Sequence, residues 1–293
     1  MNGISIIITT YHRTFFLLKL IENFLQYQRK PLPLEIIVVD DGGQDNLQAE
    51  LKERYPDSGI TYVRLNRRYR EHHEKVDFSP SVPRNVGLRL AKYDLVGIFD
   101  PEIFPMAPNL FEIVSEMPRG SYFTPNLIRL PNSDGNDTEN YNKFIGFFLN
   151  NCLNPKVCEA KALEGMVHFK SSGLAVFYNP MKDAYPPGAE LGTYIGGDNF
   201  VYRNEVVELG GYQPRIAVAF GSDVDLWKRY HRAGKTFFPN DYWMLHFPHD
   251  SSGLVWDDKL LQKLVEPQGY LDDKHSKISF YAPIEADDIV VEI

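Results

Sequence analysis

The chain has 293 residues, of which 43% are hydrophobic and 24% are charged, and its formal net charge is −8. A chain of this length and composition can bury a core as one large domain or as two smaller ones. The acidic balance argues against a nucleic-acid partner, because such partners are bound by clustered lysine and arginine.

No apolar run reaches the roughly 18 residues that a membrane-spanning helix needs. The N-terminus MNGISIIITT lacks the basic region and the cleavage site of a signal peptide. We therefore expect a cytoplasmic protein, and we leave peripheral association with the inner face of the membrane open. Cys152 and Cys158 fit no zinc framework by themselves and are expected to be reduced thiols.

The first hundred residues alternate strand-like apolar runs with helical patterns. The predicted strands cover residues 4–9, 36–39, 62–65 and 95–99. The predicted helices lie between them, at residues 17–24, at residues 47–55 and from Pro83 onward. Strands and helices that alternate at this pitch predict parallel βαβ units with right-handed crossovers.

The alternation fails from residue 120 to 195, where we expect loops, a short helix and a hairpin that carry acceptor recognition. A strand at 200–202 and a helix at 223–232 follow. The tail alternates acidic and apolar residues and ends in IVVEI, which predicts an edge strand or a partner-binding segment.

We expect one domain over residues 1–250, followed by a C-terminal extension at 251–293. The domain divides into three parts, namely a nucleotide-binding half at 1–117, a variable insertion at 118–195, and an acceptor and catalytic half at 196–250.

Polar side chains directly follow the first two predicted strands, where open α/β sheets hold their ligands. Thr9 and Tyr11 can offer a hydroxyl and an aromatic face to a base, and Asp41 can accept the imide N–H of a uracil. The alternative is a structural role for the acids of this segment, in which Asp40 or Asp45 caps the next helix.

Five segments together resemble, in order, the inverting family 2 of GT-A fold glycosyltransferases: IIITTYHR, VVDDGGQD, PRNVGLRLAKYDLVGIFDPE, GGDNFVYRNEVVELGGYQP and GSDVDLWKRYHRAG. The resemblance leaves residues 120–195 uncovered. It implies an α/β fold with a Rossmann-like, mostly parallel central sheet flanked by helices. It also implies transfer of a sugar from a nucleotide-diphosphate donor, a UDP-sugar, to a hydroxyl of a glycan or lipid-linked acceptor.

The resemblance assigns nucleotide binding to six residues: Thr9, Tyr11, Arg13, Asp41, Arg84 and Asp100. Arg84 stands near the start of a predicted helix, where a cation and backbone amides can meet phosphate oxygens. An ordinary surface ion pair is the alternative for Arg84.

The segment GIFDPE stands where the family carries two carboxylates that meet a ribose and a divalent cation. Asp100 and Glu102 are the matching residues, and Glu102 departs from the usual aspartate. Mn²⁺ or Mg²⁺ can still be held by these hard oxygen ligands, with His246 as a further ligand. An exposed acidic turn and a structural histidine are the alternatives.

The segment GSDVDLWKRY implies that Asp223 is the general base that deprotonates the acceptor hydroxyl. Ser222 replaces the usual glutamate, and a helix N-cap is the alternative role of Asp223. The donor or acceptor sugar is expected to meet Gly197, Asp198, Ser222 and Trp227. A turn glycine and a core tryptophan are the alternatives for Gly197 and Trp227.

The changes at Glu102 and Ser222 leave a second function open, namely a catalytically weakened homologue that binds a sugar nucleotide or glycan as a partner protein. A nucleotidyltransferase is disfavoured, because TTYHRT replaces a glycine-rich phosphate loop after the first strand. A dehydrogenase is disfavoured as well, because no GxGxxG motif follows a strand.

Overall fold

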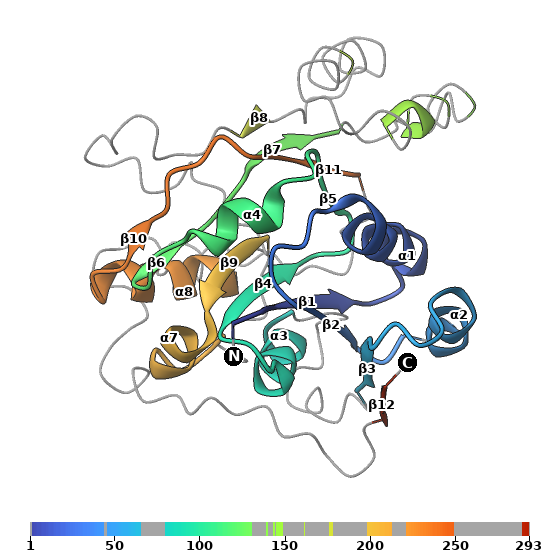
Figure 1. Ribbon diagram of the computed structural model, residues 1–293, viewed down its shortest axis with the longest axis horizontal. Helices are drawn as coiled ribbons and strands as arrows, with labels where there is room; N and C mark the ends of the chain where they lie inside the picture. The colour runs from blue at the N-terminus through green and yellow to red at the C-terminus, as the bar shows by residue number, and fades with distance from the viewer. Residues whose placement is uncertain are drawn as a thin grey trace.

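The central element of the fold is a six-stranded sheet with the strand order β12-β3-β2-β1-β4-β9 (Figure 1). The computed structural model describes residues 2–43, 46–65, 80–130, 139, 143, 145–148, 161, 176–177, 198–212, 221–248 and 289–292. The strands of the sheet are β1 (Ile4–Thr10), β2 (Leu34–Asp40), β3 (Thr61–Arg64), β4 (Leu95–Phe99), β9 (Asn199–Tyr202) and β12 (Ile289–Glu292).

The four inner strands β1 to β4 run parallel, which confirms the predicted βαβ units. The edge strands β9 and β12 pair antiparallel with β4 and β3. Residues Ile289–Glu292 of the C-terminal segment thus form the predicted edge strand, which lies beside β3 at the rim of the sheet (Figure 1).

Helices cover both faces of the sheet. The helices are α1 (Thr14–Glu22), the π-helix η1 (Asn23–Tyr27), α2 (Leu47–Arg54), α3 (Ser81–Leu90), α4 (Leu110–Ser115), α7 (Arg203–Glu208) and α8 (Gly221–Arg232). Side chains of α1, α2 and α4 pack into one hydrophobic cluster, and those of α3, α7 and α8 pack into a second cluster on the opposite face. Among the described residues, no helix has the length and apolarity to cross a bilayer.

A second, four-stranded sheet was not predicted. Its order is β5-β11-β7-β8, formed by β5 (Ile103–Pro105), β11 (Trp243–His246), β7 (Asn126–Arg129) and β8 (Val176–Phe177). Two short strands, β6 (Ser121–Tyr122) and β10 (Thr236–Phe237), pair parallel beside it. Most of the predicted insertion at 118–195 lies outside the described residues.

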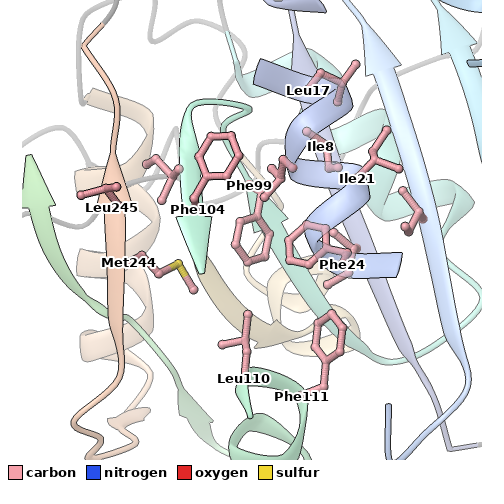
Figure 2. Close-up of a cluster of buried hydrophobic side chains, with 14 of the residues drawn as sticks. Ile8, Leu17, Ile21, Phe24, Phe99, Phe104, Leu110, Phe111, Met244 and Leu245 are labelled. Atoms are coloured by element: carbon pink, nitrogen blue, oxygen red, sulfur yellow. The ribbon is translucent and has the colours of Figure 1, made fainter. Parts of the chain in front are cut away.

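Aromatic side chains fill the core on the α1 face of the central sheet (Figure 2). Phe24 of η1 meets Phe99 of β4 edge-on, with 5.0 Å between ring centroids. Phe111 of α4 packs against Phe24 at 5.7 Å. Such pairs add about 0.5–1.5 kcal/mol beyond their buried area. This packing holds the end of β4, and hence the residue that follows it, in a fixed place.

Gly87 allows α3 to lie close against the sheet. A Cβ atom at this position would lie 2.3 Å from Cγ2 of Ile7 in β1, far inside van der Waals contact. The close approach sets the height of α3 above β1 and thereby the position of its first turn.

Gly87→Ala should therefore destabilise the protein. Ile7 is fully buried, so helix or strand must shift to admit the methyl group, and overpacking of this kind costs about 1–3 kcal/mol. Urea unfolding followed by circular dichroism measures the loss. Gly146→Ala is the matched control, because its methyl group would meet no described atom within 4 Å. Equal stability of the two variants would contradict the close fit.

Candidate functional site

The carboxyl edge of the parallel sheet gathers the polar residues singled out from the sequence. Thr10 at the end of β1 is level with Asp40 of β2, and Ile8 is level with Phe99, the last residue of β4. The strand ends therefore bring Asp41 and Asp100 to the same edge as Thr9.

The first two strand ends carry the residues expected to bind the nucleotide. Thr9 is 1% exposed and Asp41 is fully buried, with its N–H donating to the Thr10 carbonyl at 2.9 Å. Tyr11 is half-buried, and Arg13 is the residue before α1. His12 lies between them in the left-handed region, at φ 54°, which non-glycine residues seldom adopt. No feature of the sequence predicted this conformation.

Asp40 supports the turn after β2 and does not cap α2. Its Oδ1 accepts the Gly43 N–H at 2.8 Å, and its Oδ2 accepts the Tyr62 hydroxyl at 2.8 Å. The residue before α2 is Asn46, which makes no side-chain cap. The capping alternative is therefore wrong for Asp40, and Asp45 lies outside the described residues. The bonds of Asp40 fix the backbone from which Asp41 projects.

The buried Arg84 forms an ion pair with Asp100, whose side chain is 24% exposed. The Arg84 side chain is 1% exposed, and its Nη2 lies 2.9 Å from Asp100 Oδ1. The guanidinium carbon also lies 5.2 Å from the centre of the Tyr212 ring, within range of a cation–π contact. The alternative of a surface ion pair is therefore wrong. Arg84 joins the first half of α3 to the end of β4.

Asp198 adds a second carboxylate beside Asp100. Asp198 Oδ1 accepts the Asp100 N–H at 3.2 Å, and Oδ2 has no hydrogen-bond partner among the described residues. Burial, and then the negative charge of Asp100, hold the pKa of Asp198 well above its ordinary value. A buried carboxylate oxygen without a donor is costly, so this atom is a natural contact for a ligand.

Glu102 and His246 come together through the second sheet. β5 pairs antiparallel with β11, so that Ile103 is level with His246, and the Phe247 N–H donates to the Glu102 carbonyl at 2.9 Å. Glu102 is 7% exposed and His246 is 4% exposed. The exposed-turn alternative is therefore wrong for Glu102.

The donor atoms at this edge suit a divalent cation. The carboxylates of Asp100, Glu102 and Asp198 are hard oxygen ligands of the kind Mg²⁺ and Mn²⁺ prefer. Within the described parts of the chain, however, no three His, Cys, Asp or Glu residues form a group able to hold a metal by themselves. Mg²⁺ is commonly bound by one or two carboxylates together with substrate phosphates, and the residues here fit that mode.

Three of the remaining predicted residues, Ser222, Asp223 and Trp227, lie on α8. Ser222 and Asp223 are the second and third residues of this helix, so Asp223 lies within its first turn and not before it. The side chains of Ser222 and Asp223, and the whole of Gly197, lie outside what the structure describes. Trp227 is partly buried in the second cluster, and its indole N–H donates to the Tyr122 hydroxyl at 2.9 Å.

The direction of α8 follows from contacts on either side of its middle. Leu226, in the second turn of the helix, lines a small cavity of about 20 Å³ with Asn199, the neighbour of Asp198. Just beyond the other end of the helix, Lys235 pairs with Glu205 of α7 at 3.3 Å. The helix therefore begins at the carboxyl edge of the sheet.

These features describe an α/β protein with an acidic ligand site at the carboxyl edge of a parallel sheet. The chain matches the family model described as glycosyl transferase family 2 over residues 5–160, which is more than half of its length. The chain therefore belongs to glycosyl transferase family 2.

Two curated relatives share part of this region. Over 107 residues the chain is 38% identical to hyaluronan synthase from Pasteurella multocida, a match that covers 36% of this chain and 10% of that protein. Over 117 residues it is 33% identical to chondroitin synthase from Escherichia coli, covering 40% of this chain and 15% of the relative. The chain thus matches only a small part of the length of these relatives.

Solved structures share the fold. The mannosyltransferase PcManGT from Pyrobaculum calidifontis, in complex with GDP-Man and Mn²⁺, superposes with a TM-score of 0.51 at 18% identity, covering 85% of this chain and 58% of that chain. TarS from S. aureus gives 0.51 at 15% identity, covering 84% and 60%. These likenesses confirm the predicted GT-A fold.

Asp198→Asn should stabilise the protein increasingly as pH rises. Because the folded state raises the pKa of Asp198, it binds a proton more tightly than the unfolded chain does. The stability contributed by this carboxyl is therefore full below pH of about 4 and is lost as pH rises through the folded pKa. Asparagine keeps an oxygen that can accept the Asp100 N–H, and its amide does not ionise as pH rises.

Urea unfolding of both proteins from pH 4 to pH 8.5 tests this expectation. The stability of Asp198→Asn relative to the parent should grow across the range. A difference that is constant or shrinks with rising pH would contradict the burial of a protonated Asp198.

Proposed function

We propose that the chain is a glycosyltransferase that moves a sugar from a UDP-sugar to a hydroxyl of a glycan or lipid-linked acceptor. The observation that carries the proposal is the ion pair of the buried Arg84 with Asp100 at the carboxyl edge, flanked by Asp198 and Glu102. Family membership supports it, as do relatives named as synthases of two glycan polymers.

The nucleotide lies against the ends of β1 and β2 in this proposal. Asp41 accepts the imide N–H of uracil, while Thr9 and Tyr11 contact the base, and Arg13 contacts the nucleotide from the start of α1. Two observations support this placement. Thr9 and Asp41 are both buried, and β1 and β2, which lead to them, end side by side. Asp40 is engaged with Gly43 and Tyr62, and Asp41 is the acid that the sequence assigns to the base.

The diphosphate lies toward Arg84 and Asp100. Asp100 and Glu102, with His246 beside them, would hold Mn²⁺ or Mg²⁺. The cation would neutralise charge on the leaving diphosphate. Arg84 orients Asp100 through its ion pair, and Asp198 meets the donor sugar or the acceptor with its remaining oxygen. Gly197, Ser222 and Trp227 are assigned to the sugars on sequence resemblance.

Catalysis is a single inverting displacement. Asp223 removes the proton of the acceptor hydroxyl, whose oxygen forms a bond to the anomeric carbon as the bond to the β-phosphate oxygen breaks. UDP leaves with the bonding electrons. The family match ends before Asp223, so the support is the place of this residue in the first turn of α8, at the carboxyl edge.

A lipid-linked acceptor would hold a cytoplasmic enzyme at the inner face of the membrane. Hyaluronan and chondroitin oligosaccharides are the first acceptors to test, because the relatives carry these names. Nucleic acid plays no part in the proposal.

Nucleotide binding tests the donor half of the proposal. UDP should bind in the presence of Mn²⁺ and should bind at least tenfold more weakly to Asp41→Ala, which corresponds to about 1.4 kcal/mol. Isothermal titration calorimetry measures both affinities. Asp241→Ala, at an exposed aspartate before β11, is the control and should bind as the parent does.

Two further arms of the titration decide between alternatives. Equal affinity for UDP, GDP and ADP would refute the uracil assignment. Glu102→Gln keeps the shape of the side chain and removes its charge, so affinity that no longer responds to Mn²⁺ would support Glu102 as a ligand. Full Mn²⁺ dependence in this variant would remove Glu102 from the site.

The base assignment predicts a change in rate alone. Asp223→Asn should lower kcat by about 10²–10⁴ and leave the donor Kd nearly unchanged, because general-base assistance acts on the transition state. Glu208→Gln, at the exposed end of α7, is the matched control. Loss of donor binding in Asp223→Asn would indicate a structural role.

The stereochemistry of the product is an independent check. An α-linked UDP-sugar should yield a β-linked product, visible by proton NMR of the new linkage. Retained configuration would refute the inverting mechanism. Donor binding without transfer to any acceptor would favour the catalytically weakened homologue.

A further inference from the structure

The buried ion pair on α8 has no part in the proposed chemistry. Arg229 is 7% exposed and Asp225 is 1% exposed. Arg229 donates to Asp225 Oδ2 through Nε at 3.0 Å and through Nη2 at 2.6 Å. Buried ion pairs are weak evidence for stability, because desolvation offsets their attraction. The other bonds of Arg229 suggest a different purpose.

Arg229 also binds the backbone of the segment that follows α7. Its Nη1 donates to the Leu209 carbonyl, and its Nη2 donates to the Gly211 carbonyl at 2.7 Å. Gly210 and Gly211 have φ angles of 88° and 72°, which side chains rarely allow. A single guanidinium therefore holds α8 against a tight turn.

The turn ends at Tyr212, which is bound to α3. The Tyr212 N–H donates to Asn85 Oδ1 at 2.8 Å, and Asn85 Nδ2 donates to the Tyr212 carbonyl at 2.8 Å. The Tyr212 ring lies against Arg84, the partner of Asp100. A continuous set of buried contacts thus leads from α8 to the end of β4.

We propose that Arg229 is a positioning residue that keeps the start of α8 in register with the Arg84–Asp100 pair. The proposal rests on the proposed function, in which Asp223 at the start of α8 acts on a donor held at Asp100. Neither Arg229 nor Asn85 touches the ligands. Their effect passes through the turn from Leu209 to Tyr212.

Hydrogen exchange tests the connection without any ligand. Asn85→Ala, on α3, should speed amide exchange in the α8 peptide 226–232 by about fivefold or more, relative to the β2 peptide 34–40 that reports global unfolding. Arg203→Lys is the matched control. Arg203 donates to the Leu88 carbonyl and so also joins α3 to the downstream half, but near the opposite end of α3. Arg203→Lys should leave the ratio of the exchange rates of the two peptides unchanged.

Two results would overturn the proposal at this stage. One is an unchanged exchange ratio in Asn85→Ala. The other is an equal rise in Arg203→Lys, which would show that any loosening of α3 reaches α8. Since no nucleotide is present, either result stands whether or not the chain is a glycosyltransferase.

Nucleotide affinity then separates positioning from mere support of the fold. Arg229→Lys keeps the charge and loses the fork that holds two carbonyls and a carboxylate. It should weaken UDP binding in the presence of Mn²⁺ by about threefold to tenfold, because the Tyr212 ring under Arg84 loses its anchor. Arg203→Lys should retain the parent affinity.

A double-mutant cycle completes the experiment. Tyr212→Leu removes the ring and leaves the backbone bonds to Asn85, so its effect on UDP affinity should not add to that of Arg229→Lys. The proposal would be overturned if Arg229→Lys lowered the melting temperature and left the UDP affinity unchanged. Failure of the parent protein to bind UDP would refute the proposed donor, while the exchange result would still decide the connection.

Discussion

The ion pair between the buried Arg84 and Asp100 is the constraint on which the rest of the site depends. A guanidinium that is 1% exposed must keep a partner, because an unpaired charge in such a place costs several kcal/mol. The first half of α3 and the end of β4 therefore cannot move separately. Gly87 sets the depth of α3, and the backbone N–H of Asp100 in turn holds Asp198. An ion pair, a close packing contact and a hydrogen bond thus connect three segments that are distant in the chain.

The charge balance of the edge connects the proposed cation with the proposed nucleotide. Asp41, Asp100, Glu102 and Asp198 bring four carboxyl groups to it, and Arg84 pairs with one of them. A diphosphate would be repelled by such a surface if it came alone. Burial, and then the negative charges of Asp100 and Glu102, raise the pKa of Asp198, so part of this rise reflects the same excess of negative charge. A cation that binds together with the diphosphate would offset both the repulsion of the diphosphate and the excess of negative charge at the edge.

Local patterns in the sequence predicted the central sheet well. The bounds of β4 were predicted without error, and α3 began two residues before Pro83, which is tolerated in a first turn. The second sheet was missed, because β5 and β11 are short and mostly buried, and so show no alternation. Their pairing joins residues about 140 positions apart and alone brings His246 to Glu102.

The site residues were predictable by type and less so by role. Asp40 and Asp41 are adjacent, and the sequence does not reveal which one is held by a side chain of the neighbouring strand. The answer depends on Tyr62, which engages Asp40 from the neighbouring strand. Arg84 was predicted near phosphate, but its burial depends on Tyr212, which is far along the chain. Such roles follow from contacts that only the folded chain creates.

Buried polar side chains lie at both edges of the central sheet. At the amino edge, Ser5 donates to Glu35 at 2.5 Å, and the Lys92 N–H donates to the same carboxylate at 2.8 Å. At the carboxyl edge, Thr9 Oγ1, Ser81 Oγ and Asp198 Oδ2 are buried with no hydrogen-bond partner among the described residues. Buried polar atoms without partners are rare in folded proteins, and each one costs about 1–3 kcal/mol. Ligand groups that bonded to these three atoms would recover part of that cost, which supports placing the donor half of the proposed reaction at the carboxyl edge.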